Sequence, residues 1–176
     1  MKAASLSTPT GQADSDEGVD VGERVPTTVI EALTGYPQVV GVSEIIIPLL
    51  TVDIDGYPNV CLLSRAQVDA DAEHVYAVVA GLGTKSNILS NRHATLIIFT
   101  TGVVHYCKMD AASLSDQGNL LCAVFTIAST KVDGNGSLPV EAPRYIPTEA
   151  VVTFEDWGGS RAILSALKTH QTTREP

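Results

Sequence analysis

The chain has 176 residues and a formal net charge of −9 at pH 7, from 11 basic and 20 acidic side chains. This length fits one domain with a sizeable core, and the acidic balance argues against nucleic acid and anionic membrane surfaces as partners. No apolar run approaches the roughly 20 residues of a membrane-spanning helix, and three widely spaced cysteines form no metal or redox motif, so we expect a cytoplasmic protein with reduced thiols.

The first stretch of the chain is polar. Residues 1–24 are rich in Ser, Thr, Gly, Asp and Glu and contain few large apolar groups, so we expect a disordered tail. This tail also lacks the apolar segment of a secretory signal. The first folded element is a short helix over 29–33, which Thr27 or Thr28 can cap and Gly35 can end.

Two strands joined by a tight turn follow this helix. Runs rich in β-branched residues over 43–53 and 58–64 flank Asp55-Gly56, and an Asp-Gly pair between such runs is a strong hairpin signal. A polar turn region at 69–73 leads to a third strand over 74–80. The three strands are expected to form a meander.

A short helix is expected next, before a strand over 94–100. Gly83 lets the chain turn into this helix, and Thr84 or Ser86 can cap its first turn by accepting a hydrogen bond from an unpaired backbone N–H. The open N–H groups and the helix dipole attract anions, and Lys85 adds a full positive charge. This pattern indicates a phosphate site; the competing interpretation is an ordinary cap beside a solvated lysine.

The second half of the chain continues the pattern of strands. Thr101-Gly102 separates the strand over 94–100 from one over 103–109 and predicts a second hairpin. Further strands are expected over 119–132 and 150–154, and loops over 110–118 and 133–145 are expected to shape a pocket. The last element is a helix expected over 157–170. Its apolar face is formed by Ile163, Leu164 and Leu167.

These elements predict a single domain over residues 25–176. Six or seven strands with short peripheral helices indicate a mainly β (α+β) fold, a mostly antiparallel barrel with helices at its ends. A doubly wound α/β fold requires strands and helices to alternate, whereas here one helix interrupts five successive strands.

Two stretches of the chain, in this order, carry a resemblance to a known family. They are Asp55-Gly56-Tyr57-Pro58-Asn59-Val60 and Thr84-Lys85-Ser86-Asn87-Ile88-Leu89-Ser90-Asn91. Together they resemble the hairpin and the helix start of the FMN-binding split-barrel superfamily, typified by pyridoxamine 5'-phosphate oxidase. The resemblance covers about residues 28–132. It implies a six- to seven-stranded antiparallel split β-barrel and a homodimer that binds FMN at the subunit interface.

The resemblance also assigns positions to the cofactor. It implies that Lys85 meets the FMN phosphate and that Thr84 and Ser86 supply hydroxyl or backbone donors. Arg65 could reach phosphate or ribityl oxygens, although alternation along a strand turns it away from Ser64. The strand residues that the resemblance places along the flavin ring are Cys61, Leu62, Leu63 and Ser64.

Two departures from the family limit the expected substrate. Cys61 stands where pyridoxamine 5'-phosphate oxidases have an arginine for the FMN phosphate, and nothing after Trp157 reproduces their C-terminal Arg-x-His segment. Oxidation of pyridoxamine phosphate is therefore not expected. We expect an FMN-dependent oxidoreductase acting on another small molecule, and the sequence identifies no catalytic residue.

Alternatives to this function remain open. A deazaflavin in the same groove would need more basic residues near its longer anionic tail than Lys85 and Arg65. A non-enzymatic flavin- or haem-binding protein rests on His105 and Cys107, which share one face of a strand. Because no second pair accompanies them, ordinary core or pocket positions are favoured, and no metal site is predicted. Trp157 is expected to pack on the core or to cover the flavin.

Overall fold

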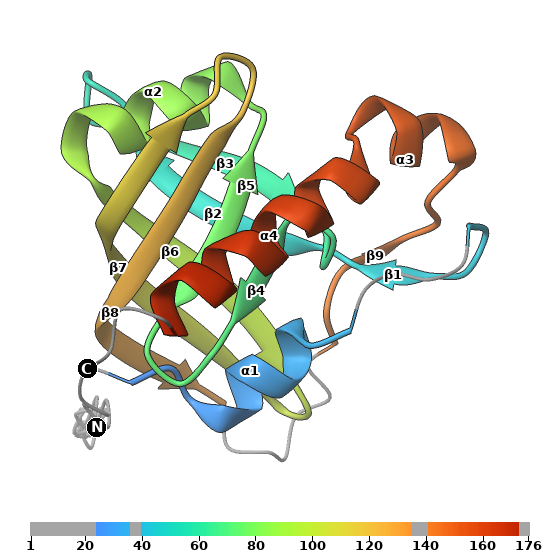
Figure 1. The fold of residues 1–176 in the computed structure, drawn as a ribbon. Helices are drawn as coiled ribbons and strands as arrows, with labels where there is room; N and C mark the ends of the chain where they lie inside the picture. The colour runs from blue at the N-terminus through green and yellow to red at the C-terminus, as the bar shows by residue number, and fades with distance from the viewer. Residues whose placement is uncertain (1–23, 36–39, 135–140, 173–176) are drawn as a thin grey trace, which may run out of the picture.

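The structure, a computed structural model, describes residues 24–35, 40–134 and 141–172. The tail expected over residues 1–24 lies outside these ranges except for its last residue. Helices and strands of the described ranges are shown in Figure 1 and run, in chain order, α1 (Thr27–Leu33), β1 (Glu44–Ile45), β2 (Ile47–Val52), β3 (Pro58–Leu63), β4 (Val68–Ala70), β5 (Val75–Val79), α2 (Leu82–Asn91), β6 (His93–Thr100), β7 (Val103–Asp116), β8 (Leu121–Asp133), β9 (Arg144–Tyr145), α3 (Glu149–Phe154) and α4 (Trp157–Thr172).

Seven of these strands form one curled antiparallel sheet in the order β3-β2-β6-β7-β8-β5-β4. Its two edge strands, β3 and β4, are consecutive in the chain and are joined only by residues 64–67, so the sheet must curl until its edges approach each other (Figure 1). The connection is held by Gln67, whose N–H donates to Ser64 O over 2.9 Å and whose carbonyl accepts from Val78 N over 2.8 Å. The predicted mainly β antiparallel fold with short helices is confirmed, as a half-barrel.

The expected meander of the first three strands is wrong. β5 pairs with β8 and β4, not with β3. The sequence analysis assigned Asp69 to a turn, whereas it lies in β4 and is only 6% exposed. Its carboxylate is paired with Arg161 at 3.1 Å and Lys168 at 3.2 Å, both from α4. Cations from a distant helix therefore stabilise a charged residue at a strand position.

Residues 149–154 form α3, so the strand predicted at 150–154 is also wrong. The side chain of Thr148 accepts from Val151 N over 3.3 Å, and Glu149 occupies the first turn. A side-chain cap and a negative charge at this end both favour a helix. None of the six residues of α3 is buried, so no apolar face requires the extended conformation.

Both predicted hairpins are present, and the strands of the second are longer than expected. Gly56 and Gly102 have φ angles of 87° and 75°, which a side chain rarely tolerates. β7 continues to Asp116 and pairs with β8 along most of that length, with two register shifts. The pocket-shaping loop expected at 110–118 is therefore mostly strand. Half of the other expected loop, 133–145, lies outside the described residues.

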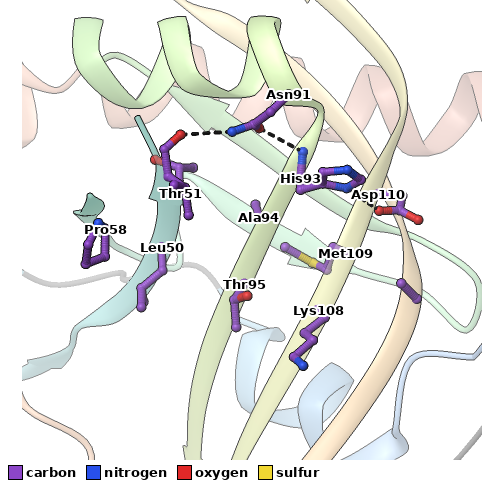
Figure 2. Close-up of a pocket in the computed structure, with 12 residues that line it drawn as sticks. Leu50, Thr51, Pro58, Asn91, His93, Ala94, Thr95, Lys108, Met109 and Asp110 are labelled. Atoms are coloured by element: carbon purple, nitrogen blue, oxygen red, sulfur yellow. Dashed lines mark hydrogen bonds and ion pairs between the residues drawn. The ribbon is translucent and has the colours of Figure 1, made fainter. Parts of the chain in front are cut away.

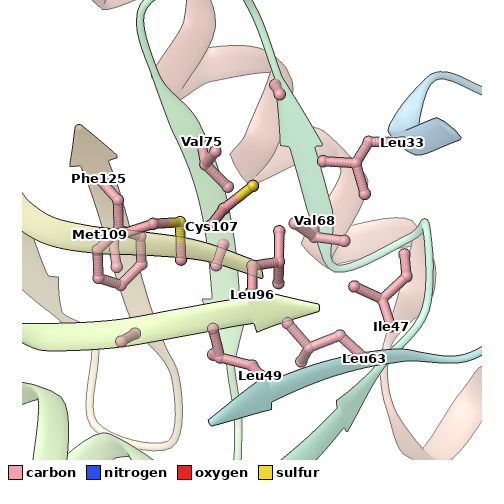
Figure 3. Packing of buried hydrophobic residues seen from close by; sticks show 14 of the residues in the cluster. Leu33, Ile47, Leu49, Leu63, Val68, Val75, Leu96, Cys107, Met109 and Phe125 are labelled. Atoms are coloured by element: carbon pink, nitrogen blue, oxygen red, sulfur yellow. The ribbon is translucent and has the colours of Figure 1, made fainter. Parts of the chain in front are cut away.

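The inner face of the sheet encloses one apolar core (Figure 3). Leu49, Leu96, Met109 and Phe125, from four neighbouring strands, are at most 1% exposed and meet in this core. Leu33 of α1 is fully buried and belongs to the same core. α1 has no side-chain cap, however, and its N-cap residue is a proline.

α4 covers the outer face of β5 and β8, on the side of the sheet opposite the core (Figure 1). Leu164 is fully buried there, in one cluster with Tyr76, Val78 and Val124. Ile163 and Leu167 pack beside it, so the predicted apolar face is confirmed. Among the helices of the described ranges, none is long and apolar enough to cross a membrane.

α2 lies against β2 and β3. Asn87 Nδ2 donates to Thr51 Oγ1 over 3.0 Å, and Asn91 Nδ2 donates to Val52 O over 2.8 Å. Both asparagines belong to the second resembling stretch, so part of that stretch fixes the helix on the sheet. The start of α2 is thereby placed over β3.

Candidate functional site

The start of α2 lies against β3. The helix begins at Leu82 with Gly81 as its N-cap, and no side chain caps it, so the prediction that Thr84 or Ser86 caps the first turn is wrong. The first N–H groups of a helix have no partner within it, and they remain available here. A Cβ at Gly83 would lie 2.9 Å from Asn59 Nδ2, so this glycine permits close approach to β3 and does not make the turn.

Cys61, which directly follows the first resembling stretch, and Thr84, from the second, meet at this contact. Thr84 is 4% exposed and hydrogen-bonds with the Cys61 side chain. Burial raises the pKa of the Cys61 thiol, the Thr84 hydrogen bond opposes this effect, and the Glu155 carboxylate adds to the rise. The thiol is therefore neutral at pH 7. Ser86 is exposed on the next turn of the helix.

Lys85 is bound by the turn between β7 and β8. Its Nζ donates to Asp116 Oδ1 over 2.6 Å and to Gly118 O over 2.5 Å, and its side chain is 12% exposed. The hydrogen bond from Lys85 is the main cause that lowers the pKa of Asp116. No role was predicted for Asp116, because it falls in the loop expected over 110–118.

A cavity of about 280 Å³ lies beside the end of β3. Three residues that the resemblance places along the flavin ring, Leu62, Leu63 and Ser64, form part of its wall. Residues 145–155 contribute others, so the site combines segments about 80 residues apart in the chain. The full lining is Ile46, Leu62, Leu63, Ser64, Tyr145, Val151 and Glu155.

Tyr145 and Glu155 are the polar cavity residues that sequence reasoning missed. Burial, followed by the charge of Glu155, raises the pKa of Tyr145 to about 12, so its hydroxyl stays protonated at neutral pH. Trp157 is 2% exposed, donates from Nε1 to Glu155 over 2.8 Å and packs edge-on against Tyr145. It therefore supports the cavity wall from behind. The only sequence signal was an aromatic residue between prolines.

Arg65 does not line this cavity. Its guanidinium forms two bonds to the buried Glu44 carboxylate, at 2.8 and 2.7 Å, and a third to Thr34 O at 3.2 Å. Ser64 is buried and hydrogen-bonds to Gln67. The two residues thus have different surroundings, and Ser64 alone of the pair lines the cavity, in keeping with their expected separation.

A larger cavity of about 450 Å³ lies on the outer face of the sheet, near the end of α2 (Figure 2). It contains none of the eight residues predicted for the cofactor. Its charged groups are Lys108 and Asp110, and Asp110 Oδ1 lies 2.6 Å from His93 Nδ1. The full lining is Leu50, Thr51, Val52, Pro58, Asn91, His93, Ala94, Thr95, Lys108, Met109, Asp110 and Ala128.

His105 and Cys107 lie side by side on β7, both buried. His105 Nε2 is 3.3 Å from the hydroxyls of Thr28 and Thr100. Burial raises the pKa of Cys107 to about 11. Within the ranges that the structure describes, no group of three or more His, Cys, Asp or Glu side chains is arranged to hold a metal ion.

The chain matches no model of a known protein family, and no curated protein matches its sequence. Solved structures similar to it include an F420 reductase (13% identity, TM-score 0.43, covering 55% of this chain and 96% of that one). An FMN-binding protein from Syntrophomonas wolfei subsp. wolfei is 14% identical with a TM-score of 0.45, over 66% and 86%. The styrene monooxygenase flavin reductase from Pseudomonas putida S12 is 6% identical with a TM-score of 0.41, over 56% and 94%. Because all three TM-scores are below 0.5, the functional argument rests on the residues described above.

Proposed function

We propose that this protein is a flavin-dependent oxidoreductase, with the flavin held between the start of α2 and the cavity beside β3. The observation that carries the proposal is the contact between Cys61 and Thr84. Cys61 directly follows the first resembling stretch and Thr84 belongs to the second, and the resemblance to FMN-binding split barrels implies that both lie at one cofactor. FMN is the flavin that the resemblance implies.

The ring end of the proposed site has groups that suit a flavin. Leu62 and Leu63 offer apolar surface, and the Tyr145 hydroxyl remains a donor because its pKa is raised to about 12. The free N–H groups at the start of α2 add donors for ribityl or ring oxygens. Ligand sites of this kind are mostly apolar with a few placed polar groups.

A bound flavin would supply the redox chemistry, as cofactors generally do. The residues of this chain would bind and orient it and exclude water from it. Cys61 and Tyr145 both have raised pKa values, so near neutral pH they are proton-bearing donors and not a nucleophile or a base. The substrate is a small molecule whose identity the site does not specify.

The phosphate end fits FMN less well than the resemblance implies. Lys85 is paired with Asp116 and Arg65 with Glu44, and the neutral thiol of Cys61 takes the place of the family's arginine. The same pairing argues against a deazaflavin, whose longer anionic tail needs more positive charge.

We also propose that the protein is a homodimer through the outer face of β2 and β3. Val52, Val60 and Leu62 expose 46%, 54% and 60% of their surface there. Exposed apolar residues gathered on one face commonly mark an interface. The cavity of Figure 2 opens on the same face. Because Leu62 also lines the proposed flavin cavity, a dimer interface on this face would border the cofactor.

Flavin binding is tested by adding riboflavin and FMN to the purified protein, following quenching of flavin fluorescence, and then adding NADH or NADPH without oxygen. We expect saturable quenching and bleaching of the bound flavin. Leu62→Glu should weaken binding by about tenfold or more, which corresponds to about 1.4 kcal/mol. Leu89→Glu, on the exposed side of α2, is the matched control. Absence of quenching by both flavins would refute the proposal, and quenching without bleaching would leave a binding protein and no oxidoreductase.

A further inference from the structure

We infer that Asp116 removes the preference of this site for a phosphate, so that the site takes riboflavin, the flavin without a phosphate, as readily as FMN. This inference rests on the proposed flavin site. It assigns Asp116 as the residue that determines which flavin binds.

Most of the hydrogen-bonding capacity of Lys85 is already used by the turn between β7 and β8. An ammonium has three N–H donors, and two of them are used by Asp116 Oδ1 and Gly118 O. The side chain of Lys85 is 12% exposed, so little of it is open to a new partner. A phosphate at this lysine would have to share it with a carboxylate at 2.6 Å or displace that carboxylate.

Asp116 is held in place by the backbone of the same turn. Gly118 N donates to Asp116 Oδ1 over 2.9 Å, and Gly118 has a φ angle of 77°, which defines a tight turn. Gln117 N donates to Leu120 O over 2.9 Å across the same turn. The carboxylate is therefore fixed by the backbone of the hairpin. Its lowered pKa keeps it ionised near neutral pH.

The side chains around the start of α2 offer no net positive charge to a phosphate. A phosphate monoester carries about −1.5 to −2 at pH 7, whereas Lys85 and Asp116 together carry none. Cys61 is neutral, and Glu155 acts on it as a negative charge. What remains is the set of free N–H groups of the helix, which hydrogen-bond neutral hydroxyls as well as phosphates. Repulsion from Asp116 offsets the attraction that a phosphate would gain.

The experiment compares dissociation constants of riboflavin and FMN, by fluorescence quenching, for the wild type, Asp116→Asn and the double variant Lys85→Ala with Asp116→Asn. In the wild type we expect the two constants to agree within about threefold. Asp116→Asn frees the charge of Lys85 and should tighten FMN by about tenfold with riboflavin unchanged. The double variant should return FMN to the wild-type value. Circular dichroism melts check that each variant folds.

Wild-type protein that binds FMN at least about tenfold more tightly than riboflavin would overturn the inference and leave the flavin site intact. An Asp116→Asn variant that folds and gains no FMN affinity would overturn it as well. If neither flavin binds any of the three proteins, the proposed function fails and this inference fails with it.

Discussion

At the scale of single residues, buried polar groups are held by partners far away in the chain. Glu44, 6% exposed, is held by Arg65, and Asn87, 7% exposed, is held by Thr51. His105 is different: its Nδ1 is buried without a hydrogen-bond partner. A buried polar atom without a hydrogen-bond partner lowers the stability of the fold. Protonation of the His105 ring would lower it further, because it would place a positive charge in a buried position.

The pH dependence of stability should report His105. Burial lowers its pKa below the ordinary value of 6.5, so below about pH 6.5 the unfolded chain binds a proton that the folded protein does not. The free energy of unfolding is therefore retained above that pH and falls as pH drops toward the folded-state pKa. Urea unfolding of the wild type should show this fall between about pH 6.5 and pH 5.5, and His105→Gln should show a smaller one. Equal slopes for the two proteins would contradict the prediction.

Individual site residues were predictable only where a motif named them. The resemblance singled out Cys61 and Thr84 as positions at one cofactor but did not pair them with each other, and their contact is seen only in the structure. Asp116, the partner of Lys85, lies 31 residues further along the chain, and no local pattern links them. Glu155 and Tyr145 reach the cavity through α3 and β9, whose positions depend on tertiary packing.

At the scale of elements, local signals were reliable where one conformation is strongly preferred. Asp55-Gly56 and Thr101-Gly102 predicted both hairpins, because each supplies a glycine with positive φ. Over 150–154 the β-branched Val151 and Val152 suggested a strand, and the cap at Thr148 decided for a helix. β4 was missed because its central residue is a charged one, Asp69, whose carboxylate is paired with two cations from α4.

α4 also has a measurable effect on stability through Leu164. This side chain is fully buried between α4 and the sheet, and Leu→Ala changes in such positions cost about 2–5 kcal/mol. Leu164→Ala should lower the free energy of unfolding by that amount in urea titrations. Ser165→Ala, on the exposed side of the same helix, should change it by less than about 0.5 kcal/mol. Equal stability of the two variants would mean that α4 is not docked as described.

At the scale of the whole molecule, the order of the strands in the sheet is the feature that the sequence did not predict. The mainly β class and the single helix among the strands followed from composition and turn residues. The placement of β5 beside β8, with β4 at the edge of the sheet, did not, since pairing between strands distant in the chain depends on the curl of the entire sheet. That curl leaves β3 as an edge strand, and its outward side chains remain uncovered in the single chain.

The proposed homodimer follows from this uncovered edge and is tested by charge. Val60 is opposite Leu50 on the outer face and is 54% exposed, so Val60→Glu should leave the fold unchanged but bury a carboxylate in a dimer, which is costly without a partner. In sedimentation experiments we expect the wild type at twice the 18.5 kDa chain mass and Val60→Glu at the monomer mass. Phe154→Glu, at a 91% exposed residue of α3 outside that face, should remain dimeric. A wild type that is monomeric at every concentration, or a dimer that Val60→Glu does not weaken, would place the subunit contact elsewhere or remove it.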